Sequence, residues 1–468
     1  MLIFDKNHLF QHEYYDLAYE SDFKFILYTK IIKRNYLVIK FGVNKVLINN
    51  IKFIDLFAGM GGFKIGLNKA ANKLSINTKC VLTSDIKSSA ISVLNTNGLD
   101  INLVNNIQGI DEKEIPSFDL LLAGFPCQPF SVAGNRQGFS DTRGTLFFDI
   151  ERILEYHKPS AFILENVPHL KTHDNGRTFS VITSTLIKLG YSISSEILDS
   201  SDFGLAQSRK RIYIVGIRED LNKRFIFDNI NHGYKTAVFG DISESGLPII
   251  NSEFTNKLLS KFTIDEVEGK LITDKRGGDN SLHSWDFGLK GEITYKQSKI
   301  LDVVFKIYRS REMAKELGME WKDGGLVTTE QIYRNFPDKD LQADLDYLVD
   351  CGYLITKNIK ISDFGEEKEI KAYSIITSRL SYEFNRILDK NGTCPTLTAT
   401  DCQKIGVIDG NGIRKLTPRE GLRLFGYPED YSFGNLSDKQ IYDLLGNTVP
   451  VNVIEAISNR LLNTLIEV

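Results

Sequence analysis

From residue 51 onward the chain alternates apolar segments with helical ones, and this alternation constrains the fold more than any other feature. The apolar segments are IKFIDLF, CVLTSD, FDLLLAGF, SAFILENV and RIYIVGI. Strands that are apolar throughout and separated by helices are typical of a parallel sheet covered on both faces. We therefore expect an α/β fold with a doubly wound sheet. Its ligands should bind at the carboxyl ends of the strands.

Composition narrows the class of protein. The chain has 468 residues, enough for two or three domains, and 42% of them are hydrophobic. No apolar run approaches the ~20 residues of a membrane span. Five cysteines, an odd number, do not indicate a disulfide framework, so we expect a reducing, intracellular compartment. The net charge of −3 weighs only mildly against a nucleic-acid partner, because local charge governs contact with phosphates.

The regions outside this alternation have different patterns. Residues 1–50 are rich in β-branched and aromatic residues, which predicts strands or a hairpin. Residues 226–300 are polar, glycine-rich and irregular. At the C-terminus, apolar residues recur on one helical face of residues 451–468, and this helix is expected to pack back on the first domain.

Residues 300–375 show a pattern of their own. One amphipathic helix is expected over 298–317, a short one after the cap candidates Thr328 and Thr329, and a third over 338–352. A hairpin should follow, over YLITKNIKIS and EIKAYSII. This order resembles a winged helix. A packed helical insertion without DNA contact is the alternative.

A glycine-containing turn follows the first apolar strand. Gly59 and Gly61 allow a ligand to approach the backbone closely, although Lys64 replaces the third glycine of the dinucleotide-binding pattern. Asp85 ends the next strand, where a carboxylate can accept hydrogen bonds from ribose hydroxyls. The pattern indicates a nucleoside-containing cofactor without phosphates. A purely structural turn is the alternative.

A candidate nucleophile follows the third apolar strand. Cys127 lies between Pro126 and Pro129, ahead of a polar, glycine-punctuated segment. A cysteine at the end of a buried strand is usually a small hydrophobe. This setting instead favours a thiol presented at the sheet edge beneath a mobile loop over 128–145.

Charged residues follow two more strands. Glu165 comes directly after four apolar residues, and an acid in that place is seldom buried without a task or a partner. Its alternative role is to cap the next segment. Arg209 and Arg211 are alternate residues of an extended segment and project to the same side, where their guanidinium groups suit a phosphate or a carbonyl oxygen. A surface charge pair is the alternative.

Six segments in order resemble the DNA cytosine-C5 methyltransferase family, whose methyl donor is S-adenosylmethionine. They are FIDLFAGMGGF, GFPCQPFSVAG, ENV, QSRKRIYIVG, RKLTPREGLRLFGYP and LLGNTVPVNVI. The match is nearly continuous over residues 51–217 and returns over 412–468. The fragment CPTLTA is similar to a short element of the family's target-recognition region.

The resemblance implies a binding site for S-adenosylmethionine. S-adenosyl-L-homocysteine is the expected product of the reaction. Most members of the family carry an acid where this chain has Asn106, which still accepts a hydrogen bond through its carbonyl oxygen. No metal is expected. The implied cofactor contacts are Phe57 and Ile86 against the adenine, Asp85 at the ribose, and Gly59, Gly61, Asn106, Asn447 and Thr448.

The resemblance also implies a catalytic set. Cys127 attacks C6 of a flipped cytosine, Glu165 holds N3 and the exocyclic amine, and Arg211 holds O2. Arg209 helps to organise the site. Ser131 and Thr396 are the implied DNA contacts. The implied division is a β-rich extension (1–50), a catalytic domain (51–225, completed by 443–468) and a target-recognition domain (226–442) with the winged-helix-like insertion (about 300–375).

The implied substrate is double-stranded DNA, bound by a monomer in the bacterial cytoplasm, without a membrane. A cognate restriction endonuclease is implied by genetic linkage only. Methylation of tRNA cytosine is one alternative, because a related branch shares these motifs, but the large variable region favours a DNA enzyme that reads sequence. A catalytically dead regulatory relative is the other alternative, and the intact Cys127, Glu165 and Arg211 argue against it.

Overall fold

The computed structural model describes most of the chain after residue 49 and the backbone of three earlier strands. The described ranges are 50–126, 146–274, 280–316, 326–363, 366–376 and 382–466. The early strands form an antiparallel sheet of order β1-β3-β2, which confirms the hairpin expected there. They are β1 (Ile3–Asp5), β2 (Ile26–Lys33) and β3 (Tyr36–Gly42).

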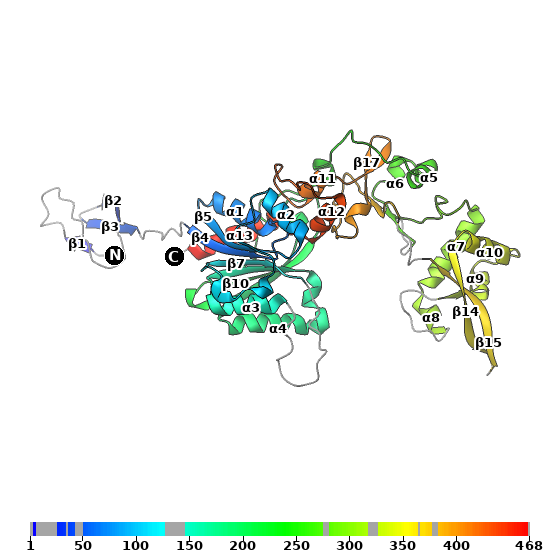
Figure 1. Cartoon of the computed structure of the whole chain (residues 1–468), viewed down its shortest axis with the longest axis horizontal. Coiled ribbons are helices and arrows are strands. Elements are labelled where there is room, and N and C mark those ends of the chain that lie inside the picture. The colour runs from blue at the N-terminus through cyan, green and yellow to red at the C-terminus, as the bar shows by residue number, and fades with distance from the viewer. Residues whose placement is uncertain are drawn as a thin grey trace.

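A seven-stranded sheet of order β6-β5-β4-β7-β8-β10-β9 forms the centre of the protein (Figure 1). The five strands from β6 to β8 in this order run parallel. The apolar segments predict four of them, β4, β5, β7 and β8, but not the two-residue β6. The strands are β4 (Asn50–Leu56), β5 (Asn77–Ser84), β6 (Leu103–Val104), β7 (Leu120–Gly124), β8 (Ala161–Asn166), β9 (Tyr191–Asp199) and β10 (Lys210–Arg218).

The expectation that RIYIVGI is a further parallel strand is wrong. This segment lies in β10, which runs antiparallel to both β8 and β9. Only residues 200–209 connect β9 to β10, and a parallel neighbour needs a crossover of a dozen residues or more. The sequence YSISSEILD of β9 was not recognised as a strand, because this edge strand is mostly half-buried and mixes polar with apolar residues.

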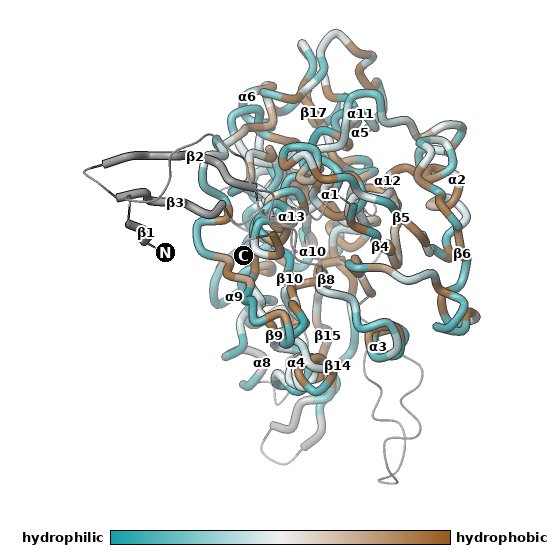
Figure 2. The backbone as a smooth tube through the Cα atoms, turned by 90° about the vertical axis from the view of Figure 1, so that its left-hand side faces the viewer, coloured by the Kyte–Doolittle hydropathy of each residue, from teal (hydrophilic) through white to brown (hydrophobic). Residues whose placement is uncertain are grey.

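Helices cover both faces of this sheet, as expected for a doubly wound fold. Helices α1 (Gly62–Lys73) and α13 (Val451–Ile466) pack on one face, and α3 (Leu146–His157) and α4 (Arg177–Lys188) pack on the other. Each face of the sheet packs against its helices in a separate hydrophobic core, and alternate residues along each strand belong to opposite cores. Leu120 and Leu122 of β7 face α1, and Leu121 faces α3. Brown apolar stretches run along the central strands in Figure 2.

The last helix packs back on the first part of the chain, which confirms the prediction made for it. Ile454, Ile457 and Leu461 share a core with Phe63 and Leu67 of α1. A Cβ atom on Gly66 of α1 would lie 2.7 Å from the Ile454 side chain. The absence of a side chain at that position therefore lets the two helices touch.

A second sheet, of order β12-β11-β16-β17-β18, is built from short strands. Its strands are β11 (Leu271–Ile272), β12 (Ser281–Leu282), β16 (Arg386–Ile387), β17 (Ile405–Asp409) and β18 (Gly412–Lys415). The helices near it are α5 (Glu253–Lys261), α6 (Ile264–Val267), α11 (Pro418–Leu424) and α12 (Asp438–Asn447). Figure 1 shows α11 and α12 between this sheet and α2 (Ser88–Thr96), beside the central sheet.

Residues 295–375 form a compact unit that lies away from the central sheet in Figure 1. The expected helix over 298–317 is interrupted at Arg309 and Ser310, and Thr328 caps α9 by accepting a hydrogen bond from the Gln331 amide (3.2 Å). The unit has its own core around Val304, Leu345 and Tyr373. Its elements are α7 (Tyr295–Tyr308), α8 (Arg311–Glu316), β13 (Val327–Thr328), α9 (Thr329–Asn335), α10 (Leu341–Asp350), β14 (Leu354–Asp363) and β15 (Glu366–Ile375), with strand order β13-β15-β14.

Over the part of the chain that the structure describes, no helix is both long enough and apolar enough to cross a membrane.

Candidate active site

The glycine turn reverses the chain between β4 and α1. Phe57, Gly59 and Gly61 all have positive φ angles, of 57°, 54° and 75°. Such a conformation is uncommon for a residue with a side chain, so Phe57 is held in a strained position. A Cβ on Gly61 would lie 2.7 Å from Leu99, whereas a Cβ on Gly59 would meet no atom within 4 Å. The turn is therefore open on the Gly59 side.

The end of β5 lies against this turn, as the sequence predicts. Asp85 accepts hydrogen bonds from the amides of Gly59 (2.8 Å) and Lys87 (2.8 Å). Ile86, the next residue, is 75% exposed.

Asp55 is a candidate residue that the sequence reasoning missed. It is fully buried in β4, and neither carboxylate oxygen lies in good hydrogen-bond geometry with a described group, although the backbone amide and the charge of Lys64 both act on it. Burial raises the pKa of Asp55 to about 8, while Lys64 opposes the rise and Asp85 adds to it. The argument made for Glu165, an acid within an apolar run, applies equally to FIDLF and would have found it.

The other expected cofactor contacts lie at the same edge. Asn447 donates a hydrogen bond to the carbonyl of Asp443 (2.8 Å), and the Asp443 carboxylate pairs with Lys87 Nζ (2.6 Å) beside the end of β5. Thr448 is buried and shares a 2.6 Å hydrogen bond with the Tyr427 hydroxyl. The end of α12 therefore borders the end of β5.

Asn106 has an exposed side chain that caps a short 3-10 turn. Its carbonyl oxygen accepts a hydrogen bond from the Gln108 amide at 3.1 Å. This oxygen has a second lone pair, so the contact with an adenine amino group that the resemblance implies remains compatible with the turn.

Glu165 and Arg211 form an ion pair at the end of β8. Arg211 Nε lies 3.0 Å from Glu165 Oε1, and both side chains are nearly buried. Burial raises the pKa of Glu165, and the charges of Arg211 and Arg209 oppose this rise. On the neighbouring strand, a Cβ on Gly124 would lie 3.4 Å from Glu165 Oε2. The second carboxylate oxygen is therefore next to the strand that leads towards Cys127.

Arg209 is directed towards main-chain carbonyls. It is 3% exposed, and its two terminal nitrogens donate to Leu397 O (2.8 Å) and Gly446 O (3.0 Å). The charges of Arg209 and Arg211 both act on the Glu165 carboxylate, although the two guanidinium groups contact different partners.

The expected DNA contacts and the nucleophile are only partly described. Thr396 donates a hydrogen bond to Ser208 O (2.9 Å), so the CPTLTA segment lies against residues 206–208. Cys127, Ser131 and the loop over 128–145 lie outside the described residues.

Comparison with known proteins identifies the family. The model of C-5 cytosine-specific DNA methylases matches residues 51–463. The chain belongs to this family. It is a DNA cytosine-C5 methyltransferase.

Three relatives of this methyltransferase match over nearly their whole lengths. It is 47% identical to the Type II methyltransferase M.NlaIV of Neisseria lactamica, over 89% of this chain and 100% of that protein. M.NgoBV of Neisseria gonorrhoeae is 46% identical with the same coverage. M.BanI of Aneurinibacillus aneurinilyticus is 39% identical, over 87% of this chain and 94% of that protein.

A solved structure supports the fold. A crystal structure of an E. coli DNA modification methyltransferase encoded within a prophage aligns with a TM-score of 0.51 at 20% identity. The alignment covers 89% of this chain and 100% of that one. At this identity the likeness concerns the fold alone.

Asn166 is a second residue that the sequence reasoning left without a role. It is buried at the end of β8, where its side-chain amide donates to Phe125 O (2.9 Å) and its carbonyl oxygen accepts from the Val167 amide (2.8 Å). Asn166 therefore fixes the backbone just before Cys127. The motif ENV contains it, but sequence alone does not reveal the strand that it reaches.

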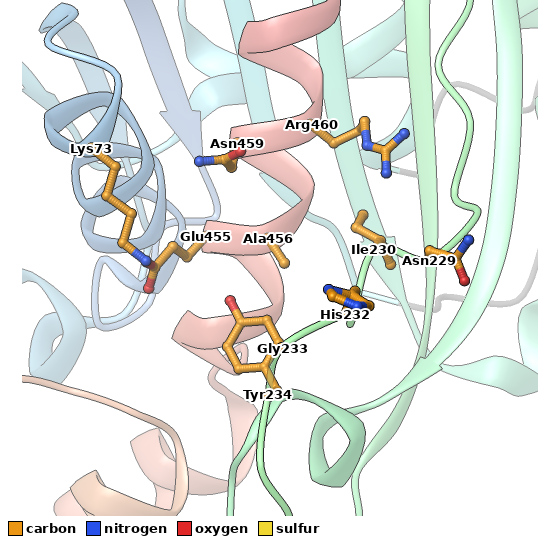
Figure 3. A pocket seen from close by; sticks show the side chains of 10 residues that line it. All are labelled: Lys73, Asn229, Ile230, His232, Gly233, Tyr234, Glu455, Ala456, Asn459 and Arg460. Atoms are coloured by element: carbon orange, nitrogen blue, oxygen red, sulfur yellow. The ribbon is translucent and has the colours of Figure 1, made fainter.

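A pocket of about 410 Å³ lies at the other end of the methyltransferase domain (Figure 3). Lys73, at the end of α1, forms an ion pair with Glu455 there, and Tyr234 and Arg460 are also in its lining. Because α1 has 12 residues, at ~1.5 Å each the pocket lies about 18 Å from the glycine turn. It is separate from the candidate active site.

Proposed function

We propose that this methyltransferase transfers a methyl group from S-adenosylmethionine to C5 of a flipped cytosine in a specific sequence of duplex DNA. The observation that carries the proposal is the buried Glu165–Arg211 pair on β8 and β10. It lies next to β7, the strand that leads to Cys127, and β7 in turn lies next to β4, which ends in the glycine turn. A carboxyl and a guanidinium in one dry site can hold the N3, amine and O2 groups of a single cytosine.

The residues around the glycine turn fit the cofactor. Asp55 is a buried carboxylate without a described partner, and S-adenosylmethionine carries cationic groups that suit it. The side of Gly59 is open, and the exposed Ile86 suits an adenine ring. Phe57 and Ile86 bind the adenine and Asp85 the ribose; Gly59, Gly61, Asn106, Asn447 and Thr448 complete the site.

The chain's own residues activate the cytosine ring, whose C5 is a poor nucleophile. The bound cofactor supplies an electrophilic methyl group. The Cys127 thiolate adds to C6, and Glu165 hydrogen-bonds N3 and the exocyclic amine, which offsets the negative charge that develops in the ring. Arg211 holds O2. C5 then accepts the methyl group. A base takes the C5 proton, the electrons of the C5–H bond re-form the C5=C6 double bond, and the C6–S bond breaks to release the Cys127 thiolate.

Because C6 is inaccessible inside a stacked duplex, the cytosine must leave the helix. Ser131 and Thr396 contact the DNA backbone in this arrangement. Residues 226–442 read the sequence, and a restriction endonuclease of the same specificity, linked genetically, is the functional partner. The enzyme acts as a monomer.

Cys127→Ser should abolish methyl transfer while DNA binding persists, because an alcohol is a far weaker nucleophile than a thiolate at neutral pH. Transfer of labelled methyl groups to duplex DNA and, in parallel, to tRNA measures this, and bisulfite sequencing of DNA from expressing cells gives the target site. Cys351→Ser, in the 295–375 unit, is the control. DNA with 5-fluorocytosine should trap the wild type covalently. Turnover by Cys127→Ser, or failure to trap, would contradict the mechanism.

We also propose that residues 295–375 form a winged helix that contributes to DNA binding. The order of two helices, a strand, two helices and a hairpin supports it, and a helical scaffold without DNA contact is the alternative. Replacing 300–375 by a short linker should weaken binding of target DNA by at least about tenfold, as expected when several phosphate contacts are lost. Filter binding measures it at fixed salt. Unchanged affinity and specificity in a folded deletion would favour the scaffold.

A further inference from the structure

The segment Gln207–Arg209 connects three parts of the molecule that are distant in sequence. Gln207 is fully buried. Its side-chain amide donates to Leu424 O at the end of α11 (3.1 Å), and its carbonyl oxygen accepts from the Leu397 amide (3.3 Å). A backbone bridge between Gln207 and Cys394 adds to this contact. The residues just before β10 are therefore joined to both α11 and the CPTLTA segment.

Arg209 connects these segments to the third part of the molecule, the end of α12. Its guanidinium bridges the carbonyls of Leu397 and Gly446, 2.8 Å and 3.0 Å away, and lies 5.2 Å from the centre of the Phe425 ring. Burial lowers its pKa to about 10. A buried cation whose two forked hydrogen bonds end on different segments fixes the distance between those segments.

The Gly446 end of this bridge is tightly packed. A Cβ on Gly446 would overlap the backbone of Thr398 and Ala399. The next two residues are Asn447 and Thr448 at the end of α12, which borders Lys87 and the end of β5. Any shift of residues 397–399 is therefore transmitted to residues 446–448.

We propose that Arg209 and Gln207 are positioning residues that couple DNA binding to cofactor binding. The inference rests on the proposed function, in which Thr396 contacts DNA and Asn447 and Thr448 contact the cofactor. DNA that fixes the position of residues 396–398 also fixes the position of Gly446. The cofactor therefore binds more tightly to the complex with DNA than to the free protein. Linkage requires the reverse effect to have the same size. A purely structural role would weaken both ligands without changing their mutual effect.

The test measures the dissociation constant of S-adenosylhomocysteine with and without a duplex carrying the site found by bisulfite sequencing. We expect the duplex to tighten binding by at least about fivefold in the wild type, in the usual range for coupled sites. The quantity compared between variants is the ratio of the dissociation constant without the duplex to that with it. In Arg209→Lys this ratio should fall below about twofold, because one ammonium cannot reproduce the forked bridge. The DNA constant, measured with and without S-adenosylhomocysteine, should change by the same ratios.

Arg419→Lys is the matched control. Arg419 also donates to two carbonyls, those of Pro428 and Tyr431, but both belong to the one loop after α11. This variant should keep the wild-type ratio. Gln207→Met, of similar size but without the two hydrogen bonds, is the second test variant if Arg209→Lys does not fold.

The outcomes separate the two proposals. A wild type that does not methylate duplex DNA overturns the proposed function and the coupling with it. A wild type that methylates DNA but shows a ratio of one overturns the coupling alone. A ratio equal to that of the wild type in folded Arg209→Lys or Gln207→Met also overturns the coupling alone. Loss of the ratio in these variants, but not in Arg419→Lys, supports it.

Discussion

The carboxyl edge of the central sheet has two halves, and they differ in whether a buried acid has a side-chain partner. In the glycine-turn half (residues 55–62 and 85–87), Asp55 is buried without a described partner and Ile86 is exposed. In the ion-pair half (Glu165, Arg209 and Arg211), the carboxylate is already paired with a guanidinium. Under the proposed function, the cofactor completes the first half, and the second half is preorganised to stabilise charge that develops during the reaction.

Glu165→Gln should produce the largest effect, because it removes the acid of the ion-pair half and keeps its shape. We expect kcat to fall by about 10²–10³-fold, the usual cost of losing one group that stabilises charge in a transition state. Affinity for S-adenosylhomocysteine, which concerns the other half, should change by less than about threefold. Single-turnover methylation and calorimetric titration measure the two quantities.

Glu455→Gln is the control for this prediction. Glu455 is also buried and paired with cations, Lys69 and Lys73, but it lies at the far pocket of Figure 3. The kcat of the Glu455→Gln variant should match that of the wild type. If Glu165→Gln lost cofactor affinity as severely as kcat, the two halves would not be independent and the comparison would fail.

The parallel part of the fold could be predicted from sequence because fully buried strands are apolar throughout. β4, β5, β7 and β8 all carry this signal, and so does the amphipathic face of α13. The direction of β10 could not be predicted, because a strand's sequence does not state which way its neighbour runs. That direction follows from the length of the β9–β10 connection, and β9 itself carried too weak a pattern to be recognised.

For the site, local motifs predicted that the glycine turn and the end of β5 lie together, but not the contacts between distant segments. Gly59 and Asp85 meet as expected, because the ends of adjacent parallel strands share one edge. The contacts of Asn166 with Phe125 and of Arg209 with Gly446 join distant segments. They depend on packing that no single motif encodes.

Asp55→Asn should sharpen the comparison through the pH dependence of stability. The folded-state pKa of Asp55, about 8, lies above the unfolded value near 4, so the folded state holds an extra proton between these pH values. The resulting stability is complete below about pH 4 and is lost as pH rises towards 8. In the ligand-free protein, Asp55→Asn should flatten this decline, as urea unfolding at pH 6 and pH 8 would measure.

Asp430→Asn, at an exposed position after α11, is the matched control and should leave the slope unchanged. Asp55→Asn should also weaken S-adenosylhomocysteine binding, because the ligand loses a carboxylate partner. A wild-type slope in Asp55→Asn would show that Asp55 already has a partner in the ligand-free protein. The glycine-turn half would then be as complete as the ion-pair half.

Lys87→Gln should produce the smallest effect, although it breaks an ion pair that is shorter than the Glu165–Arg211 pair. Lys87 Nζ lies 2.6 Å from Asp443 Oδ2, but the two side chains are 45% and 37% exposed, so water and salt screen the attraction. We expect the free energy of unfolding to fall by less than about 1 kcal/mol, and high salt to remove the difference. Urea unfolding at low and high salt measures both. A larger, salt-resistant loss would mean that the contact between β5 and α12 depends on this pair, and that the glycine-turn half is held by charge rather than by packing.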